Sequence, residues 1–438
     1  MRKSVILSVL VLAMIMSLSF ATVTVTFWHA MGGQKMEFLK SMAEQFMKIH
    51  PDIKVVVQYT GSYRDTLNKL IAAAGTSNAP DIVQVFDVGT QIMVDGDIEV
   101  PMQQFIDSDP TFDVGSLLPQ VLSYYRLNGK LYSMPFNSSN AIMYYNKTMF
   151  KKAGLDPDNP PRTYDEFIAA CKALTKKDSN GNIIQSGFTT PLHSWIFEQM
   201  MAAQDALMAD NNNGRTGRPT KTVFDSAAGL KIFQLWNTLS QNDWMINTKK
   251  EDWDAADALF VSQKVGMLIT STSDVSYMMK MAKEKGFELG TSFLPVPEGS
   301  KPGGAVIGGA SLWIIKGHPK DETQAAWEFV KFMASKPEQM AWHKMTGYFP
   351  ISKDAVSTML MNGWYSKNPA HLTALMQLLL SKQDYASRGA IIGAYPQIRT
   401  AIETALENMI QGKWTPGYAL NWANKQSTIA IQDYNSSY

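Results

Sequence analysis

The run Val23-Thr24-Val25-Thr26-Phe27-Trp28 decides the fold, because its apolar and polar residues alternate as in a half-buried strand. Two further β-rich stretches follow at 53–59 and 81–86. Between them lie runs with apolar residues at helical spacing, which Pro51 and Pro80 close. Strands joined by helix-length connections are typical of a parallel sheet. The sequence therefore predicts an α/β protein that begins β-α-β-α-β.

Polar and aromatic side chains stand where each of these strands ends. Trp28 and His29 end the first strand, Tyr63 lies just beyond the second, and Asp87 follows the third. Open parallel sheets bind ligands outside the carboxyl ends of their strands. We therefore expect these four residues to line one crevice that suits a small polar ligand.

A second α/β region follows Pro135. It contains an apolar, β-like run at 141–145, a helix capped by Thr163 that runs through Leu174, and a buried strand from Val265 that leads into Ser271. The remainder of the chain reads as mostly helical. With 438 residues, the chain is long enough for two or three domain-sized units.

Residues 1–21 have the pattern of a secretory signal peptide. Arg2 and Lys3 precede an apolar run over 5–20, and small residues at Ser19 and Ala21 suit cleavage after Ala21. An uncleaved anchor is the alternative. Cleavage after Ala21 would make Thr22 the first residue of the mature protein, where a lipid anchor needs a cysteine. We therefore expect the mature protein to be free in the bacterial periplasm.

Composition narrows the possible partners. The chain has 40 basic and 39 acidic residues, and loss of Arg2 and Lys3 with the signal peptide leaves 38 basic residues. The mature protein would therefore have no excess of positive charge, which a nucleic-acid-binding protein usually has. The lone Cys171 cannot form an internal disulfide, and no later apolar run approaches the ~20 residues that span a bilayer.

Motifs for catalysis and cofactors are missing. The sequence has no phosphate-binding glycine loop, no dinucleotide fingerprint, no H-E-x-x-H pair and no G-x-S-x-G elbow. We therefore predict a protein with no cofactor, no metal and no enzymatic activity. An exported glycosidase or phosphodiesterase stays the rival from another class, because glycosidase carboxylates are spaced in three dimensions only. Tyr144, Tyr145 and Trp195 could line a sugar site in either case.

Several longer motifs resemble one family, the substrate-binding proteins of ABC importers, and within it the glycerol-3-phosphate-binding type. The similarity runs from about Val23 to the last helix. The motifs that carry it are Phe27-Trp-His-Ala-Met-Gly-Gly33, Tyr59-Thr-Gly-Ser-Tyr63, Pro80–Thr90, Pro135-Phe-Asn-Ser-Ser139, Tyr144-Tyr-Asn-Lys147, Ile307-Gly-Gly-Ala-Ser-Leu-Trp313, Thr346-Gly-Tyr-Phe-Pro350 and Pro396-Gln-Ile-Arg399.

The resemblance implies a two-lobed periplasmic-binding-protein fold of type II, with the ligand cleft between lobes and the chain crossing at a hinge. Lobe one would comprise 22–137 and 272–335, and lobe two 138–271 and 336–438. It also implies a monomer that closes on a small polar ligand and delivers it to a membrane permease.

The resemblance further implies the roles of individual residues. Tyr63 and Asp87 match positions that hold glycerol hydroxyls, and Tyr164 matches an apolar wall against the glycerol carbons. The positions that match phosphate contacts are Ser139, Ser271, Gly309, Tyr348 and Arg399. These positions offer a guanidinium, hydroxyl donors and backbone N–H groups, which are the groups that bind phosphate in proteins.

Three positions depart from the family pattern. Asp87 stands where Glu is usual, Tyr164 where Trp is usual, and Ile391 where an arginine is frequent. The expected ligand is glycerol-3-phosphate or a glycerophosphodiester, and an oligosaccharide is the alternative.

Overall fold

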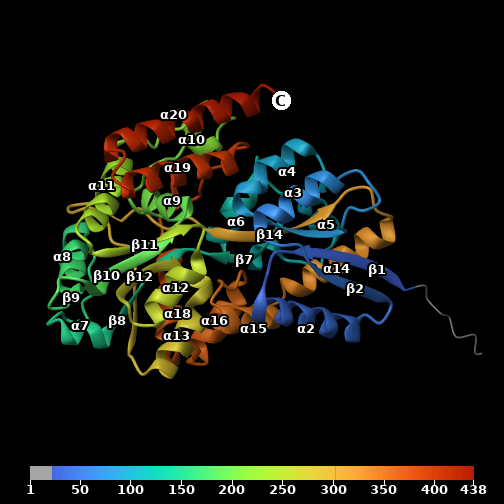
Figure 1. Ribbon diagram of the computed structural model, residues 1–438. Helices are drawn as coiled ribbons and strands as arrows, with labels where there is room; N and C mark the ends of the chain where they lie inside the picture. Colours follow the sequence, from blue (N-terminus) through green and yellow to red (C-terminus); the bar gives the residue numbers. More distant parts are fainter. Residues whose placement is uncertain (1–21, 301) are drawn as a thin grey trace, which may run out of the picture.

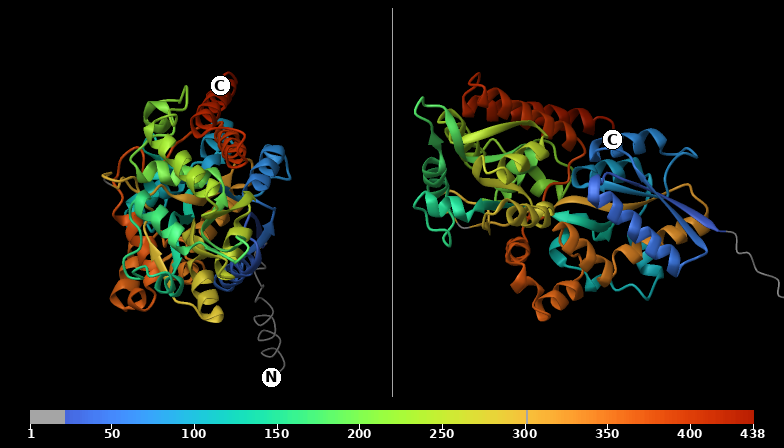
Figure 2. Two further views of the ribbon diagram at one scale, coloured as in Figure 1. Left: turned by 60° about the vertical axis from the view of Figure 1, so that its left-hand side comes forward. Right: turned by 60° about the horizontal axis from the view of Figure 1, so that its bottom comes forward.

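Two sheets form the frame of the protein, one in each of two lobes that lie side by side (Figures 1 and 2). The computed structural model describes residues 22–300 and 302–438. The signal-peptide prediction for 1–21 lies outside the described residues. Within the described part, none of the helices is long and apolar enough to cross a membrane.

The first sheet has the strand order β2-β1-β3-β14-β4, with β7 also paired to β14. Its strands are β1 (Val23–His29), β2 (Ile53–Tyr59), β3 (Ile82–Phe86), β4 (Glu99–Val100), β7 (Met134–Ser139) and β14 (Gly308–Ile315). As expected, β1 runs parallel to β2 and β3. The late strand β14 enters antiparallel between β3 and β4, so the sheet is mixed.

The second sheet has the order β11-β10-β12-β8-β13, with β9 also paired to β10. Its strands are β8 (Ala141–Asn146), β9 (Lys176–Lys177), β10 (Ile183–Leu192), β11 (Met245–Lys250), β12 (Val265–Ser271) and β13 (Leu289–Ser292). A separate hairpin pairs β5 (Arg126–Leu127) with β6 (Lys130–Leu131).

Helices cover both sheets. In the first half of the chain they are α2 (Gly33–Ile49), α3 (Tyr63–Ala73), α4 (Thr90–Gly96), α5 (Met102–Ser108), α6 (Pro119–Tyr125), α7 (Lys147–Lys152), α8 (Tyr164–Leu174), α9 (Ser194–Ala203) and α10 (Asp210–Gly214). The second half adds α11 (Ala227–Gln241), α12 (Trp253–Val261), α13 (Val275–Lys285), α14 (Lys320–Met333), α15 (Lys336–Thr346), α16 (Lys353–Met361), α17 (Trp364–Lys367), α18 (Pro369–Leu379), α19 (Tyr395–Ile410) and α20 (Pro416–Asn435). Single 3₁₀ turns are η1 (Asp87–Gly89), η2 (Val114–Ser116) and η3 (Thr272–Asp274).

Apolar periodicity explains how the first lobe packs. In β1 the alternate residues Val25 and Phe27 are fully buried. In α2 the residues Leu39, Met42 and Phe46, spaced at three and four positions, are buried too. Because a strand buries every second residue and a helix every third or fourth, these two patterns bring α2 against the sheet.

The chain crosses between the lobes several times. It leaves the first sheet through β7 and enters the second through β8, one residue later. It returns through β14, which lies in the first sheet although it is far along the chain (Figure 1). The segment 272–335, expected in lobe one, is divided: β13 pairs with β8 in the second sheet, and β14 lies in the first. These crossings place the cleft at the border of the two sheets.

Candidate functional site

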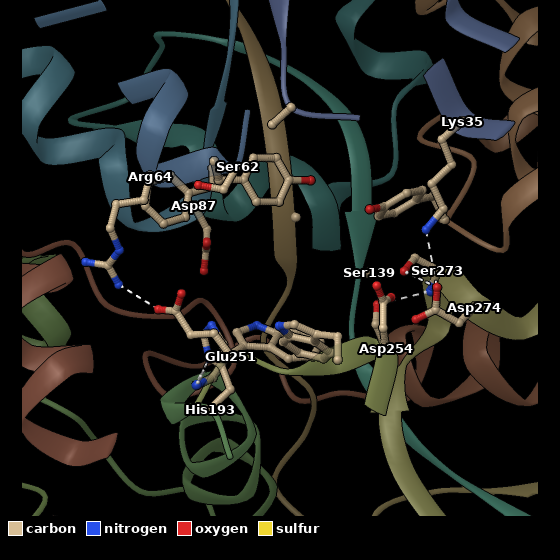
Figure 3. Close-up of a pocket in the computed structure, with 18 of the residues that line it drawn as sticks. Lys35, Ser62, Arg64, Asp87, Ser139, His193, Glu251, Asp254, Ser273 and Asp274 are labelled. Atoms are coloured by element: carbon tan, nitrogen blue, oxygen red, sulfur yellow. Dashed lines mark hydrogen bonds and ion pairs between the residues drawn. The ribbon is translucent and has the colours of Figure 1, made fainter. Parts of the chain in front are cut away.

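A pocket of about 400 Å³ lies where the two lobes meet (Figure 3). Side chains from both lobes line it: Ala30, Lys35, Ser62, Tyr63, Arg64, Phe86, Asp87, Ser139, His193, Trp195, Glu251, Trp253, Asp254, Asp257, Ser271, Ser273, Asp274, Gly309, Tyr348 and Arg399. Its wall is therefore rich in charged, hydroxyl and aromatic groups.

A capping box places Tyr63 and Arg64 at the cleft. Ser62 Oγ accepts the backbone N–H of Asp65 at 3.1 Å, and Asp65 Oδ2 accepts that of Ser62 at 3.0 Å. This reciprocal pair fixes the first turn of α3. Tyr63 then stacks on Phe86, with ring centroids 5.7 Å apart, and its hydroxyl accepts Asn137 Nδ2–H at 2.7 Å. Burial raises the pKa of Tyr63 well above 10, so its hydroxyl keeps a proton to donate.

An ionic network crosses the deepest part of the cleft. Arg399 of α19 donates from Nε and Nη2 to the two oxygens of Glu198, each at 2.8 Å, and from Nη2 to Asp87 Oδ2 at 2.8 Å. Asp87 belongs to the first lobe, and Arg399 and Glu198 belong to the second. All three residues are at most 5% exposed. Burial would lower the pKa of Arg399, but Asp87 and Glu198 raise it well above its ordinary value.

This burial also acts on Asp87. The pKa of its carboxyl is raised, chiefly by desolvation, although Arg399 opposes the shift. Asp87 and the Arg399 guanidinium form a buried ion pair at 2.8 Å, so a ligand that separates them must offer both groups a new partner.

A second charged group lies at the other end of the pocket. Lys35 Nζ lies 3.3 Å from Asp274 Oδ1, and Asp254 lies nearby (Figure 3). Asp257 lines the pocket too, and its charge acts on Lys35. Desolvation together with Asp274 raises the pKa of Asp257 well above its usual range. The pKa of Lys35 is also raised, since Asp274 outweighs the effect of burial. This end of the pocket is acidic.

Two indoles and a second ion pair form the rest of the wall. Trp195 and Trp253 have ring centroids 5.7 Å apart, and His193 lies 5.1 Å from Trp253. Arg64 of the first lobe donates to Glu251 of the second at 2.9 Å (Figure 3). The indoles offer flat apolar faces beside carboxylates, an arrangement suited to sugars and to organic cations.

One group of side chains in the cleft has the composition of a metal site. His193, Glu251 and Glu403 each place one ligand atom within 4.8 Å of the others. However, His193 Nδ1 accepts the backbone N–H of Trp195 at 3.0 Å. Its lone pair on that nitrogen is therefore already used.

Seven of the ten ligand contacts expected from the sequence line this pocket: Tyr63, Asp87, Ser139, Ser271, Gly309, Tyr348 and Arg399. They come from well-separated parts of the chain. Of the aromatic residues considered for a sugar site, Trp195 lines the pocket, whereas Tyr144 and Tyr145 pack within the second lobe.

The other three lie elsewhere. Trp28 borders a separate surface hollow and donates from Nε1 to Gln58 at 3.1 Å. His29 is fully buried and accepts the N–H of Met31 at 3.1 Å. Tyr164 is buried at the start of α8, where Gln204 Nε2 donates to its hydroxyl at 3.3 Å. Neighbouring strand residues face opposite sides of a sheet, so Trp28 and His29 could not both face one crevice.

Other pocket residues were not among the expected contacts, notably Lys35, Arg64 and Trp253, and neither was the supporting Glu198. Glu198 had one signal in the sequence: it is the charged residue of the run Trp195–Ala203, in which only Gln199 is also polar. A charge in such a helix needs a buried partner.

Comparison with known proteins agrees with this architecture. A family model described as "Bacterial extracellular solute-binding protein" matches residues 41–374. The chain belongs to this family. As a solute-binding protein, it captures a small polar ligand for the permease of an ABC importer and is not an enzyme.

Curated relatives of this solute-binding protein span nearly its whole length. It is 34% identical over 428 residues to the sn-glycerol-3-phosphate-binding periplasmic protein UgpB of Escherichia coli (strain K12), covering 95% of this chain and 94% of the relative. The protein of that name from Shigella flexneri serotype 5b is 34% identical over 425 residues, with 95% and 94% covered. The family and these relatives are extracellular or periplasmic.

Solved structures share the two-lobed fold. UgpB from Mycobacterium tuberculosis in complex with glycerophosphocholine has a TM-score of 0.79 at 19% identity, covering 94% of this chain and 99% of that one. An ABC transporter solute-binding protein from Thermotoga lettingae, bound to α-D-tagatose, has a TM-score of 0.77 at 21% identity, covering 93% and 99%. The fold expected from the sequence is confirmed.

Proposed function

We propose that the protein captures a glycerol phosphate compound, glycerol-3-phosphate or a glycerophosphodiester, by closure of its two lobes. One observation carries the proposal: seven residues expected to hold such a ligand line a single pocket between the lobes. The curated relatives are named for binding sn-glycerol-3-phosphate, and a structural neighbour holds glycerophosphocholine.

The chemistry of the pocket supports a division of roles. We assign the glycerol hydroxyls to Tyr63 and Asp87, which offer a phenol and a carboxylate at the first-lobe side. We assign the phosphate to Arg399 and to the other expected contacts: Ser139, Ser271, Tyr348 and the backbone N–H of Gly309. Since Glu198 occupies the Nε–Nη2 edge of Arg399, the phosphate would use its remaining N–H groups or displace Asp87.

Charge balance favours the diester. Five carboxylates and three cations line the pocket. The acidic residues therefore outnumber the basic ones, and Glu198 lies directly behind Arg399. A phosphate monoester would bring a charge of about −1.5 to −2, whereas a diester brings about −1. A diester with a cationic headgroup, such as glycerophosphocholine, would place that cation near the indoles and the acidic side chains.

An oligosaccharide is the second candidate. The observation that favours it is the indole pair of Trp195 and Trp253 beside Glu251, together with an Arg399 already neutralised by carboxylates. Sugars stack their apolar faces on indoles and hydrogen-bond to carboxylates, and they bring no charge.

Calorimetric titration of the ligand-free protein with glycerophosphocholine, glycerol-3-phosphate and maltotriose tests the proposal. We expect one-to-one binding, tightest for glycerophosphocholine. Binding of maltotriose alone would replace the proposal with the second candidate.

Two tryptophan variants make this test sharper. Trp253→Ala should weaken glycerophosphocholine binding about tenfold, the equivalent of one cation–π contact of ~1–2 kcal/mol, and weaken glycerol-3-phosphate binding less. The matched control is Trp28→Ala, outside the pocket, which should leave both affinities unchanged.

We also propose cleavage of a signal peptide after Ala21 and a mature protein free in the periplasm without a lipid anchor. The sequence pattern at 1–21 and the periplasmic relatives support this. The intact mass of the exported protein tests it: a chain that begins at Thr22 with no added lipid mass is expected. Retention of residues 1–21 would contradict the proposal.

A further inference from the structure

Three side chains with metal-binding atoms converge in the first lobe, away from the pocket. Asp81 lies just before β3, His318 lies between β14 and α14, and Glu322 lies in the first turn of α14. His318 Nδ1 is 3.1 Å from Asp81 Oδ1 and 3.5 Å from Glu322 Oε2. One ligand atom from each residue lies within 4.8 Å of the other two.

The second ring nitrogen of His318 fixes what Nδ1 can do. His318 Nε2 lies 3.1 Å from the carbonyl oxygen of Pro80, which can only accept a hydrogen bond. Nε2 therefore carries a proton, and in a neutral imidazole the lone pair is on Nδ1. In the neutral ring this lone pair faces two carboxylate oxygens, at 3.1 Å and 3.5 Å, which is the arrangement of ligand atoms around a metal ion.

The burial of Asp81 is a second observation that points to a ligand. The residue is only 4% exposed. Its Oδ2 accepts the backbone N–H of Thr26 at 2.7 Å, whereas its buried Oδ1, which points at His318, has no hydrogen-bond partner in the described chain. A buried carboxylate oxygen without a partner is costly, and such atoms in folded proteins are normally satisfied.

We propose that Asp81, His318 and Glu322 bind a divalent cation of the zinc type. In a tetrahedral site with metal–ligand bonds of about 2.0–2.2 Å, neighbouring ligand atoms are about 3.3–3.6 Å apart. The two distances from His318 Nδ1, 3.1 and 3.5 Å, are close to this spacing. Imidazole and carboxylate ligands suit zinc, and a carbonyl on the other ring nitrogen is the usual support of a zinc-bound histidine.

The surroundings allow entry of the ion. The side chain of Glu322 is 33% exposed and that of His318 is 15% exposed, so the cluster opens to solvent on one side. A water molecule can complete the coordination there. The spacing of these residues in the sequence gives no zinc motif, because Asp81 and the other two ligands lie far apart in the chain.

The position of the cluster indicates a structural role. Asp81 bonds through its backbone carbonyl to Ile315 N–H of β14 and through Oδ2 to Thr26 of β1. The ion would therefore join α14 to three neighbouring strands of the first sheet. Since it lies outside the ligand pocket, it should stabilise the lobe without changing ligand affinity.

Titration of the EDTA-treated full protein with ZnCl2 tests the proposal. Calorimetry should show one zinc per chain, and thermal unfolding should shift to higher temperature with zinc. Glu322→Gln, at a partly exposed position, should fold normally and lose zinc affinity by about tenfold or more. His50→Ala, which removes a histidine outside the cluster, is the matched control and should bind zinc like the native protein.

Cobalt gives a second readout that does not depend on stability. Co²⁺ bound in this tetrahedral N/O site should give a visible absorption band that is lost in His318→Gln. The proposal is overturned if the native protein binds no zinc at micromolar concentration. It is also overturned if Glu322→Gln and His318→Gln bind zinc as tightly as the His50→Ala control does. A third contrary result is that His318→Gln lowers the unfolding temperature, whereas zinc does not change the unfolding temperature of the native protein. That last result would identify His318 as a protonated ion-pair partner.

Discussion

Arg399→Ala is expected to destabilise the folded protein as well as to remove a ligand contact. Arg399 makes three charge-assisted hydrogen bonds of 2.8 Å to Glu198 and Asp87. The variant leaves both carboxylates buried with no cation between them. Breaking a buried ion pair from one side costs about 3–5 kcal/mol of unfolding free energy.

Urea unfolding at pH 7.5, followed by tryptophan fluorescence, measures this loss. Arg64→Ala is the matched control, since it breaks another ion pair across the cleft, with Glu251 at 2.9 Å, whose side chains are 36% and 46% exposed. Exposed pairs contribute about 1 kcal/mol or less. The double variant Arg399→Ala/Glu198→Gln should recover about 1–3 kcal/mol, because it removes one of the uncompensated charges.

The pH dependence gives a further check. Burial already raises the pKa of Asp87 in the native protein, and loss of the guanidinium should raise it more. With a folded-state pKa above the unfolded one, the folded state gains stability as the pH falls, so the deficit of Arg399→Ala should be smaller at pH 5 than at pH 8. The reasoning is refuted if Arg399→Ala costs no more than Arg64→Ala, or if the double variant recovers nothing.

Three other predictions concern single residues. Burial raises the pKa of Glu99 from 4.5 to about 7, so stability from its protonation is present below pH 4.5 and lost as the pH rises through 7. The gain in unfolding free energy from Glu99→Gln should therefore be larger at pH 8 than at pH 5, as measured by urea unfolding. An equal gain at the two pH values would contradict this. Gly309→Ala should lose ligand binding in calorimetry and unfold at lower urea, since φ is +92° and the new Cβ would lie 1.9 Å from the Asn137 carbonyl oxygen. Gly317→Ala, at φ +96° with no atom within 4 Å, should cost only the backbone strain of ~1–2 kcal/mol, and equal losses would contradict the clash. The buried thiol of Cys171, whose pKa is raised well above its ordinary value, should react with a thiol reagent only in urea, and rapid labelling of the native protein at pH 8 would contradict its burial.

Local patterns in the sequence were enough to predict the start of the fold. Alternation in 23–28 and helical spacing in 38–49 depend on neighbours in the chain, and the structure has β1 and α2 there. The positions of β13 and β14 were not predictable in this way. Each pairs with a strand far away in the sequence, and no local period specifies which of the two sheets it joins.

The site was predictable in part for the same reason. Tyr63 and Asp87 follow strand ends, which the sequence places at the crevice. The pairing of Arg399 with Glu198 links two helices that are distant in the chain, so it appears only in three dimensions. Tyr164 lies on α8 of the second lobe and packs into its interior, whereas Trp195 and Trp253 supply the aromatic wall.

A crystal structure of the protein with glycerophosphocholine tests the central claim most directly. The account predicts the ligand between the lobes, with its phosphate bonded to Arg399, Ser139 and Ser271 and its glycerol hydroxyls on Tyr63 and Asp87. The cationic headgroup should lie against Trp253. A ligand bound outside this pocket, or one whose phosphate makes no contact with Arg399, would contradict the account.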